Sequence, residues 1–382
     1  MPEWKIPLYK VYWDEEDVEM VTKVIKRGTY WTTGPEVEEF EKTVADYVGV
    51  KYGVTFNSGT SALHAVLLVC GIKESDEVIV PSFTFIATAN AVLFVNAKPV
   101  FADIEEKTFG LNPEDVEGKI TEKTKVIMPI HYGGLPCKIK ELKEIAEDHG
   151  LLLIEDAAES IGASINGRKV GSFGDAAMFS FCGNKIITTG EGGIIVTNSG
   201  EVYERLKLIR SHGRLEFEPY FMSIKTPDYV TLGYNWRMSS ITAALGISQI
   251  RKLNEAIKMR RRNAEYLTSK LSRIDGVEIP KPPEGYFHVY QMYTIRVKGG
   301  RKVRDALKNH LANKGIITKV YFEPVHLTYF YREKFGYKGG ELPVTERLSG
   351  EVLTLPLYPT MTTDEMNYIV ESIEEFFQER GN

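Results

Sequence analysis

Residues 179–193, FSFCGNKIITTGEGG, place a lysine, Lys185, between a hydrophobic run and a segment dense in glycine and threonine. Met178, Phe179 and Phe181 have the pattern of a buried strand, whereas lysine normally lies on a solvated surface. One interpretation is therefore a simple surface-loop lysine. The other is that the strand delivers an amine into the interior for a chemical purpose, and the surrounding sequence has to distinguish the two.

Short β-rich runs alternate with helical patterns around this stretch, from about residue 50 to residue 200. Several runs are continuously apolar, as in VIMPI and LLLIED, which is typical of strands covered on both faces by helices. Helical patterns such as SALHAVLLVC and KIKELKEIAEDHG lie between them, and Gly150 is expected to end the second. We predict an α/β fold with a mainly parallel, seven-stranded sheet flanked by helices. The predicted strands are 54–57, 77–81, 99–104, 125–131, 151–157, 176–181 and 193–198.

The pattern changes after Met238. A long charged helical segment, KLNEAIKMRRRNAEYLTSKLSRI, is followed by a PPEG loop, a strand pattern near residues 291–297 and further helix and strand signals. We predict a large α/β domain over residues 1–245, including the N-terminal segment, and a smaller C-terminal α+β domain over residues 246–382.

Composition excludes several classes of function. With 43% hydrophobic and 26% charged residues and a net charge of −5, the 382-residue chain has no electrostatic signature of a nucleic-acid or membrane-surface partner. Its three cysteines, Cys70, Cys137 and Cys182, lack CxxC spacing, so we expect neither disulfides nor a metal site. No stretch approaches the roughly 20 apolar residues of a membrane span, and no signal peptide is apparent. We expect a soluble cytoplasmic protein.

Three predicted strand ends carry polar residues, and ligands of open α/β sheets bind outside the carboxyl ends of strands. At the first, Asn57 is followed by SGTSALHA, and a helix is expected to begin at about Thr60. Free N–H groups at this helix start, beside the hydroxyls of Ser58, Thr60 and Ser61, would suit a phosphate group. The same pattern is also typical of an ordinary N-cap.

The second strand end, IEDAAES, has two adjacent acids and then Glu159. A carboxylate at the end of a buried strand is costly unless it meets a cation or several donors, which makes Asp156 a candidate for holding a protonated group. Magnesium, a ribose hydroxyl or the cap of the following helix would satisfy it as well.

The third strand end is the opening stretch, in which Ser180 lies on the strand that leads to Lys185. A phosphate cradle, an acid that could pair with a ring nitrogen and a lysine that could form a Schiff base are together what pyridoxal phosphate (PLP) requires. A nucleotide phosphate loop is a weaker interpretation of SGTSAL, because the chain lacks GxxxxGK[ST].

Eight motifs occur along the chain in the order NSGTSAL, PSFTFIATANAV, IEDAAESIGA, FSFCGNKIITTGEGG, RSHG, LGYNWRMSSITAALG, PVHL and LTLPLYP. From about residue 7 to residue 375 the chain thereby resembles the fold-type I PLP-dependent sugar aminotransferases of the DegT/DnrJ/EryC1/StrS family. The resemblance implies that Lys185 holds PLP covalently and moves a proton between substrate and cofactor carbons. It implies that Asp156 pairs with the pyridine nitrogen and keeps it protonated, which preserves the ring as an electron sink.

The resemblance also implies the remaining cofactor contacts. Glu159 would lie near the phenolic oxygen, and repulsion between the two negative groups should raise the pKa of Glu159. Phe85 would stack on the ring, although core packing is an alternative. Asn235 would reach the phosphate of the neighbouring subunit, which implies a homodimer with shared active sites. The implied phosphate contacts within the chain are Gly59, Thr60, Ser61 and Ser180.

Two positions depart from the pattern of the family. Cys182 and Gly183 stand where relatives often have histidine or tyrosine, which affects the shape of the pocket wall. Lys185 is present, whereas relatives that dehydrate sugars have histidine at this position. Glu159 is similar to the residue of the perosamine-synthase branch, which aminates C4 of a nucleotide-linked 4-keto-6-deoxy sugar.

The implied reaction is a ping-pong transamination, with L-glutamate as the donor and a keto group of a nucleotide-linked sugar as the acceptor. The sugar nucleotide would lie at the dimer interface near Trp31, Arg237 and His326; alternatively, Trp31 is core and His326 is structural, as we expect for His131 and His212. Other interpretations are an aminotransferase for a keto-cyclitol or aromatic precursor and a non-catalytic regulatory protein, against which the intact lysine argues.

Overall fold

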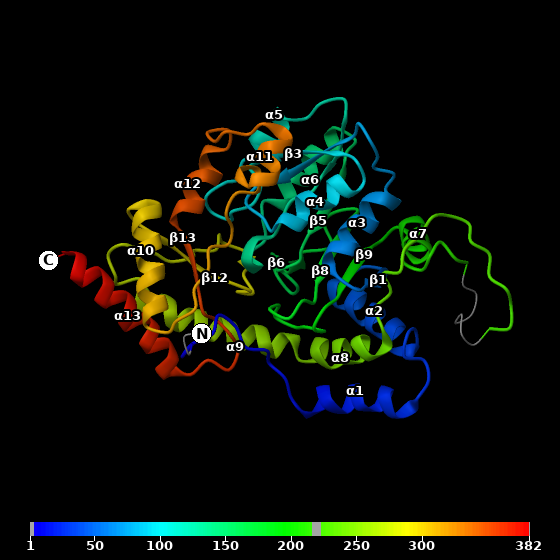
Figure 1. The fold of residues 1–382 in the computed structure, drawn as a ribbon, viewed down its shortest axis with the longest axis horizontal. Helices are drawn as coiled ribbons and strands as arrows, with labels where there is room; N and C mark the ends of the chain where they lie inside the picture. The colour runs from blue at the N-terminus through cyan, green and yellow to red at the C-terminus, as the bar shows by residue number, and fades with distance from the viewer. Residues whose placement is uncertain (1–3, 216–222, 382) are drawn as a thin grey trace.

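The computed structural model describes residues 4–215 and 223–381 and has the predicted α/β architecture (Figure 1). A seven-stranded sheet has the strand order β1-β9-β8-β5-β4-β2-β3. β9 is antiparallel to both of its neighbours, and the other adjacent pairs are parallel. The strands are β1 (Tyr52–Phe56), β2 (Glu77–Pro81), β3 (Lys98–Ala102), β4 (Thr124–Ile127), β5 (Leu152–Asp156), β8 (Ala176–Ser180) and β9 (Gly193–Thr197).

All seven predicted strands are present, and the largest difference from the predicted bounds lies at the end of β4. β4 stops at Ile127 rather than at residue 131. Pro129 has no N–H to donate to a ladder, so regular pairing ends before it. The chain nevertheless stays beside β5, because the Pro129 carbonyl accepts the N–H of Asp156 at 2.9 Å and the His131 N–H donates to the Asp156 carbonyl at 3.1 Å. These bonds fix the backbone of Asp156 at the strand end.

Helices cover both faces of the sheet. The helices of this part of the chain are α1 (Glu15–Arg27), α2 (Pro35–Val48), α3 (Gly59–Val69), α4 (Ile86–Phe94), α5 (Pro113–Gly118), α6 (Ile139–Asp148), α7 (Gly200–Arg210) and α8 (Ser240–Arg251), with a 3₁₀ turn, η1, at Tyr132–Gly134. Successive strand residues point to opposite faces. Ile154 therefore packs with α3 and α4, and Leu153 packs with α6. Gly150, with φ +63°, follows the end of α6 as predicted.

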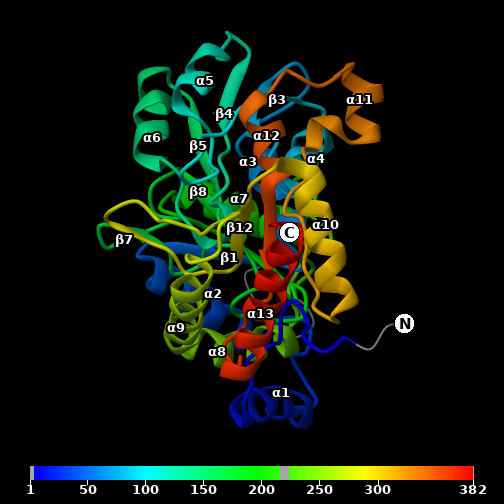
Figure 2. The same cartoon turned by 90° about the vertical axis from the view of Figure 1, so that its left-hand side faces the viewer.

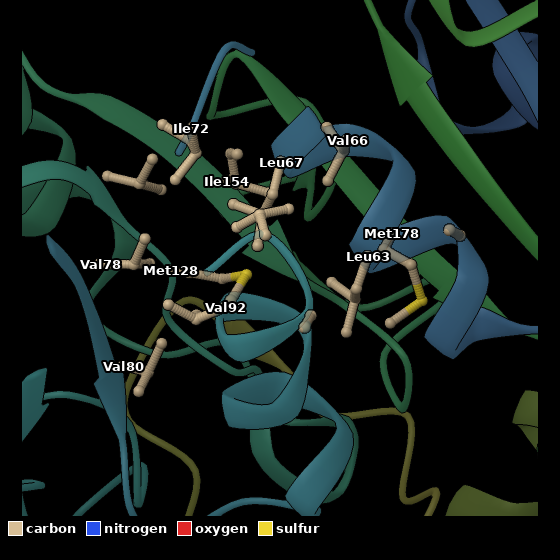
Figure 3. Packing of buried hydrophobic residues seen from close by; sticks show 14 of the residues in the cluster. Leu63, Val66, Leu67, Ile72, Val78, Val80, Val92, Met128, Ile154 and Met178 are labelled. Carbon is tan, nitrogen blue, oxygen red and sulfur yellow. The ribbon is translucent and has the colours of Figure 1, made fainter. Parts of the chain in front are cut away.

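The apolar side chains beneath α3 and α4 are almost completely buried. Leu63 and Leu67 of α3 are at most 1% exposed and face Ile154 and Met178 of the sheet (Figure 3). Burial of such side chains stabilises the fold by about 1.5–3 kcal/mol each. This packing holds α3 against β8 and β9.

The C-terminal part of the chain forms an apolar cluster of its own around a three-stranded antiparallel sheet of order β10-β12-β13. The helix α10 lies beside β12 (Figure 2). The N-terminal segment also contacts this part, because Lys5 and Ile6 donate backbone hydrogen bonds to Gly315. The proposed domain boundary at residues 245/246 stays a prediction. The elements are α9 (Leu253–Leu271), β10 (Val277–Glu278), β12 (Tyr293–Val297), α10 (Gly300–Asn313), η3 (Val325–Leu327), α11 (Tyr329–Phe335), α12 (Pro343–Glu351), β13 (Val352–Leu355) and α13 (Thr363–Gly381).

A small antiparallel sheet of order β11-β6-β7 joins the two parts. Its strands are β6 (Ser164–Ile165), β7 (Arg168–Lys169) and β11 (Tyr286–Phe287). Across residues 4–215 and 223–381, no helix has the length and apolar character that a membrane crossing needs.

Candidate active site

The three strand ends singled out in the sequence meet at one cleft of about 660 Å³. β5 ends at Asp156, β8 ends at Ser180, and α3 begins directly after β1. Of the predicted cofactor contacts, those that line this cleft are Gly59, Thr60, Phe85, Asp156, Glu159, Ser180 and Lys185, and the departures Cys182 and Gly183 line it too. The structure thus brings a lysine, two carboxylates and a helix N-terminus together.

The start of α3 combines an N-cap with two available backbone donors. The Ser58 hydroxyl accepts the N–H of Ser61 at 3.1 Å, and the Ser61 hydroxyl donates to Asn57 Oδ1 at 2.7 Å. The N-cap interpretation is thus correct for Ser58, and Ser61 is not among the residues that line the cleft. The N–H groups of Gly59 and Thr60 have no partner within the helix, which is the arrangement that suits an anion.

Glycines let the helix start approach the sheet closely. A Cβ on Gly59 would lie 3.1 Å from Met178 Sδ and 3.2 Å from Ser180 Cβ. A Cβ on Gly193 would lie 2.6 Å from the Ser58 carbonyl oxygen. Gly193, one of the glycines that follow Lys185, therefore allows β9 to lie against the N-terminus of α3, beside the Ser180 hydroxyl.

Asp156 is a buried acid with few donors. Thr88 Oγ1 donates to its Oδ2 at 2.7 Å, and the Ala158 N–H donates to its Oδ1 at 3.2 Å. Burial raises the pKa of Asp156, and the bonds from Thr88 and Ala158 and the charge of Lys185 offset this only in part. A protonated ring nitrogen would supply the missing cationic donor, so the residues present fit the pyridine ring of PLP.

The neighbouring Glu155 shows how a structural acid differs. Burial would raise its pKa, but the hydrogen bond from His131 and those from backbone N–H groups outweigh burial, and its pKa is lowered. Cys137 N–H donates to His131 Nδ1, so the ring proton lies on Nε2 and is donated to Glu155 at 2.9 Å. Three backbone N–H groups, of Gly171, Phe173 and Gly174, complete its shell at 2.7–2.8 Å. His131 is therefore structural, as expected.

Lys185 is mostly sheltered from solvent. Its side chain is 13% exposed, and Nζ lies 3.6 Å from Glu159 Oε1. The other oxygen of Glu159 accepts the Gly133 N–H at 2.9 Å. The pKa of Glu159 is raised, as expected, but burial is its main cause, with the charge of Asp156 adding to it. The surface-loop interpretation of Lys185 is wrong.

The cleft also accounts for Phe85, the N-cap residue of α4. Its side chain is 59% exposed within the cleft lining, so the alternative of core packing is wrong. An exposed aromatic ring in the same cleft as Asp156 offers a flat apolar face on which a planar heterocycle could stack.

Four other predicted contacts do not line this cleft: Asn235, Arg237, Trp31 and, described below, His326. The exposed Asn235 pairs with Ser211, and the Arg237 guanidinium donates to the Ser211 hydroxyl at 3.2 Å. The Trp31 indole is 46% exposed, which excludes core packing, and donates to the Val24 carbonyl.

His326 is the clearest correction among the substrate residues. Its ring is fully buried, with Nδ1 2.6 Å from the Ser82 hydroxyl and Nε2 3.2 Å from Glu346. The Glu346 carboxylate can only accept, so Nε2 carries the ring proton and donates to Glu346. Nδ1 then accepts the Ser82 hydroxyl, whose oxygen accepts the backbone N–H of His326. The ring has no free polar atom to offer a substrate in the cleft of this chain, and the structural alternative applies.

Several cleft residues were not identified from the sequence. Thr88 belongs to the motif PSFTFIATANAV, one helical turn after Phe85, so its place beside the cleft could have been inferred. Tyr9, Lys319 and Tyr321 come from distant segments and carry no local signal. Glu191 stands in the glycine-rich stretch and is 3.6 Å from the Cys182 thiol.

Replacing Thr88 by valine is expected to weaken PLP binding about tenfold. The substitution removes the hydroxyl that stabilises the ionised form of Asp156, and a hydrogen bond to a charged group is worth about 1.5–3 kcal/mol. Thr84 contacts Thr88 at 2.7 Å but not Asp156, so Thr84→Val is the matched control with a smaller effect. Titration of PLP into the apo-protein, followed by absorbance, measures both; equal affinity of Thr88→Val and wild type would contradict the role.

A mainly parallel sheet with a lysine, an acid and a phosphate cradle at the strand ends defines a fold-type I PLP-dependent enzyme. Comparison with known proteins narrows the class: residues 11–374 match the model of the DegT/DnrJ/EryC1/StrS aminotransferase family, and the chain belongs to that family. It is therefore a PLP-dependent transaminase.

Known relatives include proteins named for different products. GDP-perosamine synthase of Escherichia coli O157:H7 is 36% identical, over 98% of this chain and 99% of the relative. A Streptococcus pneumoniae structure solved in its PLP form is 27% identical with a TM-score of 0.92, covering 98% and 99% of the two chains. The structure of 3-amino-5-hydroxybenzoic acid synthase is 29% identical with a TM-score of 0.89 at the same coverage.

Proposed function

We propose that the protein transfers an amino group from L-glutamate to a keto group of a nucleotide-linked 4-keto-6-deoxy sugar by a ping-pong mechanism. The observation that carries the proposal is the convergence of Lys185, Asp156 and the α3 N-terminus on one cleft. We further propose that the reaction takes place in the cytoplasm, which is consistent with three free cysteines.

Each cleft residue has a chemical task in this proposal. PLP, when bound, supplies an electron sink for the carbon that loses its proton. Lys185 Nζ would hold the cofactor and would move the proton at the substrate carbon. Asp156 would keep the ring nitrogen protonated, while Gly59, Thr60 and Ser180 would hold the phosphate. Glu159, with its raised pKa, can share a proton with the phenolic oxygen.

The acceptor assignment is supported by the relatives. Three GDP-perosamine synthases are 35–38% identical over more than nine-tenths of this chain. The test is a half-reaction: the aminated form of the protein is mixed with keto sugars linked to different nucleotides, and return of the aldehyde form is followed by absorbance. Rapid return with a nucleotide-linked 4-keto sugar is the expected result, and return with no such sugar would contradict the proposal.

A second acceptor class is favoured by one comparison, the structural similarity to 3-amino-5-hydroxybenzoic acid synthase. An aromatic precursor or keto-cyclitol lacks the diphosphate of a sugar nucleotide. Including both compounds in the half-reaction panel distinguishes the two functions, because only one class of acceptor should restore the aldehyde form at a useful rate. Restoration by neither class in a protein that retains Lys185 would favour a regulatory role.

We also propose a homodimer with shared active sites. Large apolar side chains are exposed on α1, on the loop after it and on the segment before α8, part of which extends beyond the body of the sheet (Figure 1). Exposed apolar side chains in such numbers are typical of an interaction surface. They are Val18, Ile25, Tyr30, Trp31, Ile224, Tyr229, Val230 and Leu232.

Asn235→Asp is expected to be strongly impaired, because a carboxylate would replace a phosphate donor of the partner's site. Mixing refolded Asn235→Asp and Lys185→Ala subunits should restore about a quarter of wild-type activity, since half of the dimers are mixed and each mixed dimer has one intact site. Turnover by the mixture, normalised to wild-type dimer, measures this. No gain over the separate variants would place Asn235 in its own subunit's site or outside both.

A further inference from the structure

The proposed function assigns no role to one cationic residue of the cleft, Lys319. The charged residues that line the cleft are Asp156, Glu159, Glu191, Lys185 and Lys319. Lys185 is paired with Glu159 at 3.6 Å. Lys319 forms no ion pair with any residue in the part of the chain that the structure describes, and its side chain lies on the exposed wall of the cleft.

The backbone of Lys319 is held in place by hydrogen bonds to β13. Its N–H donates to the Thr354 carbonyl at 3.1 Å, and its carbonyl accepts the Thr354 N–H at 2.8 Å, which ties it to β13. Tyr321, two residues on, lies on the same side of the extended chain, and Lys319 Nζ is 5.4 Å from the centre of its ring. The aromatic face attracts the ammonium group weakly and limits where it can go. Tyr9, from the N-terminal segment, completes this wall.

The remaining charges of the cleft make this cation chemically important. Three of the five charged lining residues are carboxylates, so an anionic substrate group finds few cationic side chains in the cleft. Both substrates of the proposed reaction carry anions, the carboxylates of the amino-acid donor and the diphosphate of a sugar nucleotide. Lys319 is the lining cation that can meet them without first breaking an ion pair.

We propose that Lys319, supported by Tyr321, forms an anion-binding subsite that holds a substrate carboxylate or diphosphate during transamination. This inference rests on the proposed function, because that function explains why an anionic substrate group enters the cleft. The test of the inference measures binding and does not depend on turnover. A lysine ammonium recognises either anion as a point charge, and arginine at this position should preserve much of the binding.

The experiment uses two unreactive probes with the PLP-loaded protein: succinate for the donor carboxylates and GDP for the nucleotide diphosphate. Their binding is measured by calorimetric titration to wild type, Lys319→Met and Lys319→Arg. Lys319→Met is expected to weaken one probe by on the order of tenfold, and Lys319→Arg should retain most of the affinity. Loss of succinate binding assigns the subsite to the donor, and loss of GDP binding assigns it to the acceptor.

Lys302 provides a matched control. It is an exposed lysine on α10 that does not line the cleft, so Lys302→Met changes the net charge equally and should leave both probes unaffected. Equal affinities of Lys319→Met and wild type for both probes, or no binding of either probe to wild type, would overturn the inference. If Lys319→Met weakens a probe while wild type aminates no keto sugar, the proposed function fails and the anion subsite stands.

Discussion

Lys185→Ala is expected to lower the rate of amine transfer on the order of 10⁴-fold or more. The substitution removes both the covalent attachment of the cofactor and the base that moves the proton, and a positioned general acid–base alone contributes about 10²–10⁴-fold. The half-reaction with L-glutamate, followed in a single turnover, measures this loss without interference from the acceptor. Borohydride reduction should fix PLP to Lys185 in wild type and leave Lys185→Ala unlabelled.

Lys169 is the control lysine for this experiment. It is also partly sheltered, and burial lowers its pKa, but its Nζ rests on the Tyr47 ring at 3.5 Å, outside the cleft. Lys169→Met should therefore transfer the amine at close to the wild-type rate. A Lys185→Ala protein with normal turnover, or borohydride labelling at another lysine, would show that a different amine carries the chemistry.

The parts of the fold and site that could be predicted depend on local patterns. Continuous apolar runs mark the buried strands, and the strand-end rule places Asp156 and Lys185 at the same edge of the sheet. Thr88 lay within reach of the same reasoning, because it follows Phe85 by one helical turn. The incorrect end of β4 was avoidable as well, since Pro129 cannot donate to a ladder.

The parts that could not be predicted depend on tertiary packing. Lys319 and Tyr321 reach the cleft because backbone pairing with β13 carries their segment there, and nothing in the local sequence indicates this pairing. His326 belongs to a recognisable motif, yet a motif does not say which way a ring points, and its ring points to Ser82 and Glu346. The types and order of the residues thus predicted the chemistry of the site better than they predicted which residues line the cleft.

Asp156 and Glu155 are adjacent acids at the end of one strand, and their replacements should separate catalysis from stability. Asp156→Asn is expected to lose about 3 kcal/mol of transition-state stabilisation, which is roughly two powers of ten in the rate of the glutamate half-reaction. A neutral amide cannot hold the ring nitrogen protonated. Glu155→Gln leaves that contact intact, so folded Glu155→Gln protein should react at close to the wild-type rate.

The effects on the free energy of unfolding should have opposite signs. The pKa of Asp156 is raised in the folded apo-protein, so this group stabilises the fold at low pH and loses that contribution as pH rises through its folded pKa. The ionised form of Asp156 therefore destabilises the folded apo-protein at neutral pH. Asp156→Asn removes this charge and should raise the melting temperature of the apo-protein. A protein stabilised by its own inactivating substitution is expected where an acid is kept for chemistry.

Glu155 has the reverse dependence, because its folded pKa is lowered. Its contribution is present above the unfolded pKa of about 4.3 and is lost as pH falls through the folded value. Glu155→Gln turns an amide toward four donors and should cost about 1–3 kcal/mol at neutral pH, measured by denaturant unfolding of the apo-protein. Full half-reaction activity in Asp156→Asn would remove Asp156 from the mechanism, whereas a slow Glu155→Gln protein would show that the two acids act together.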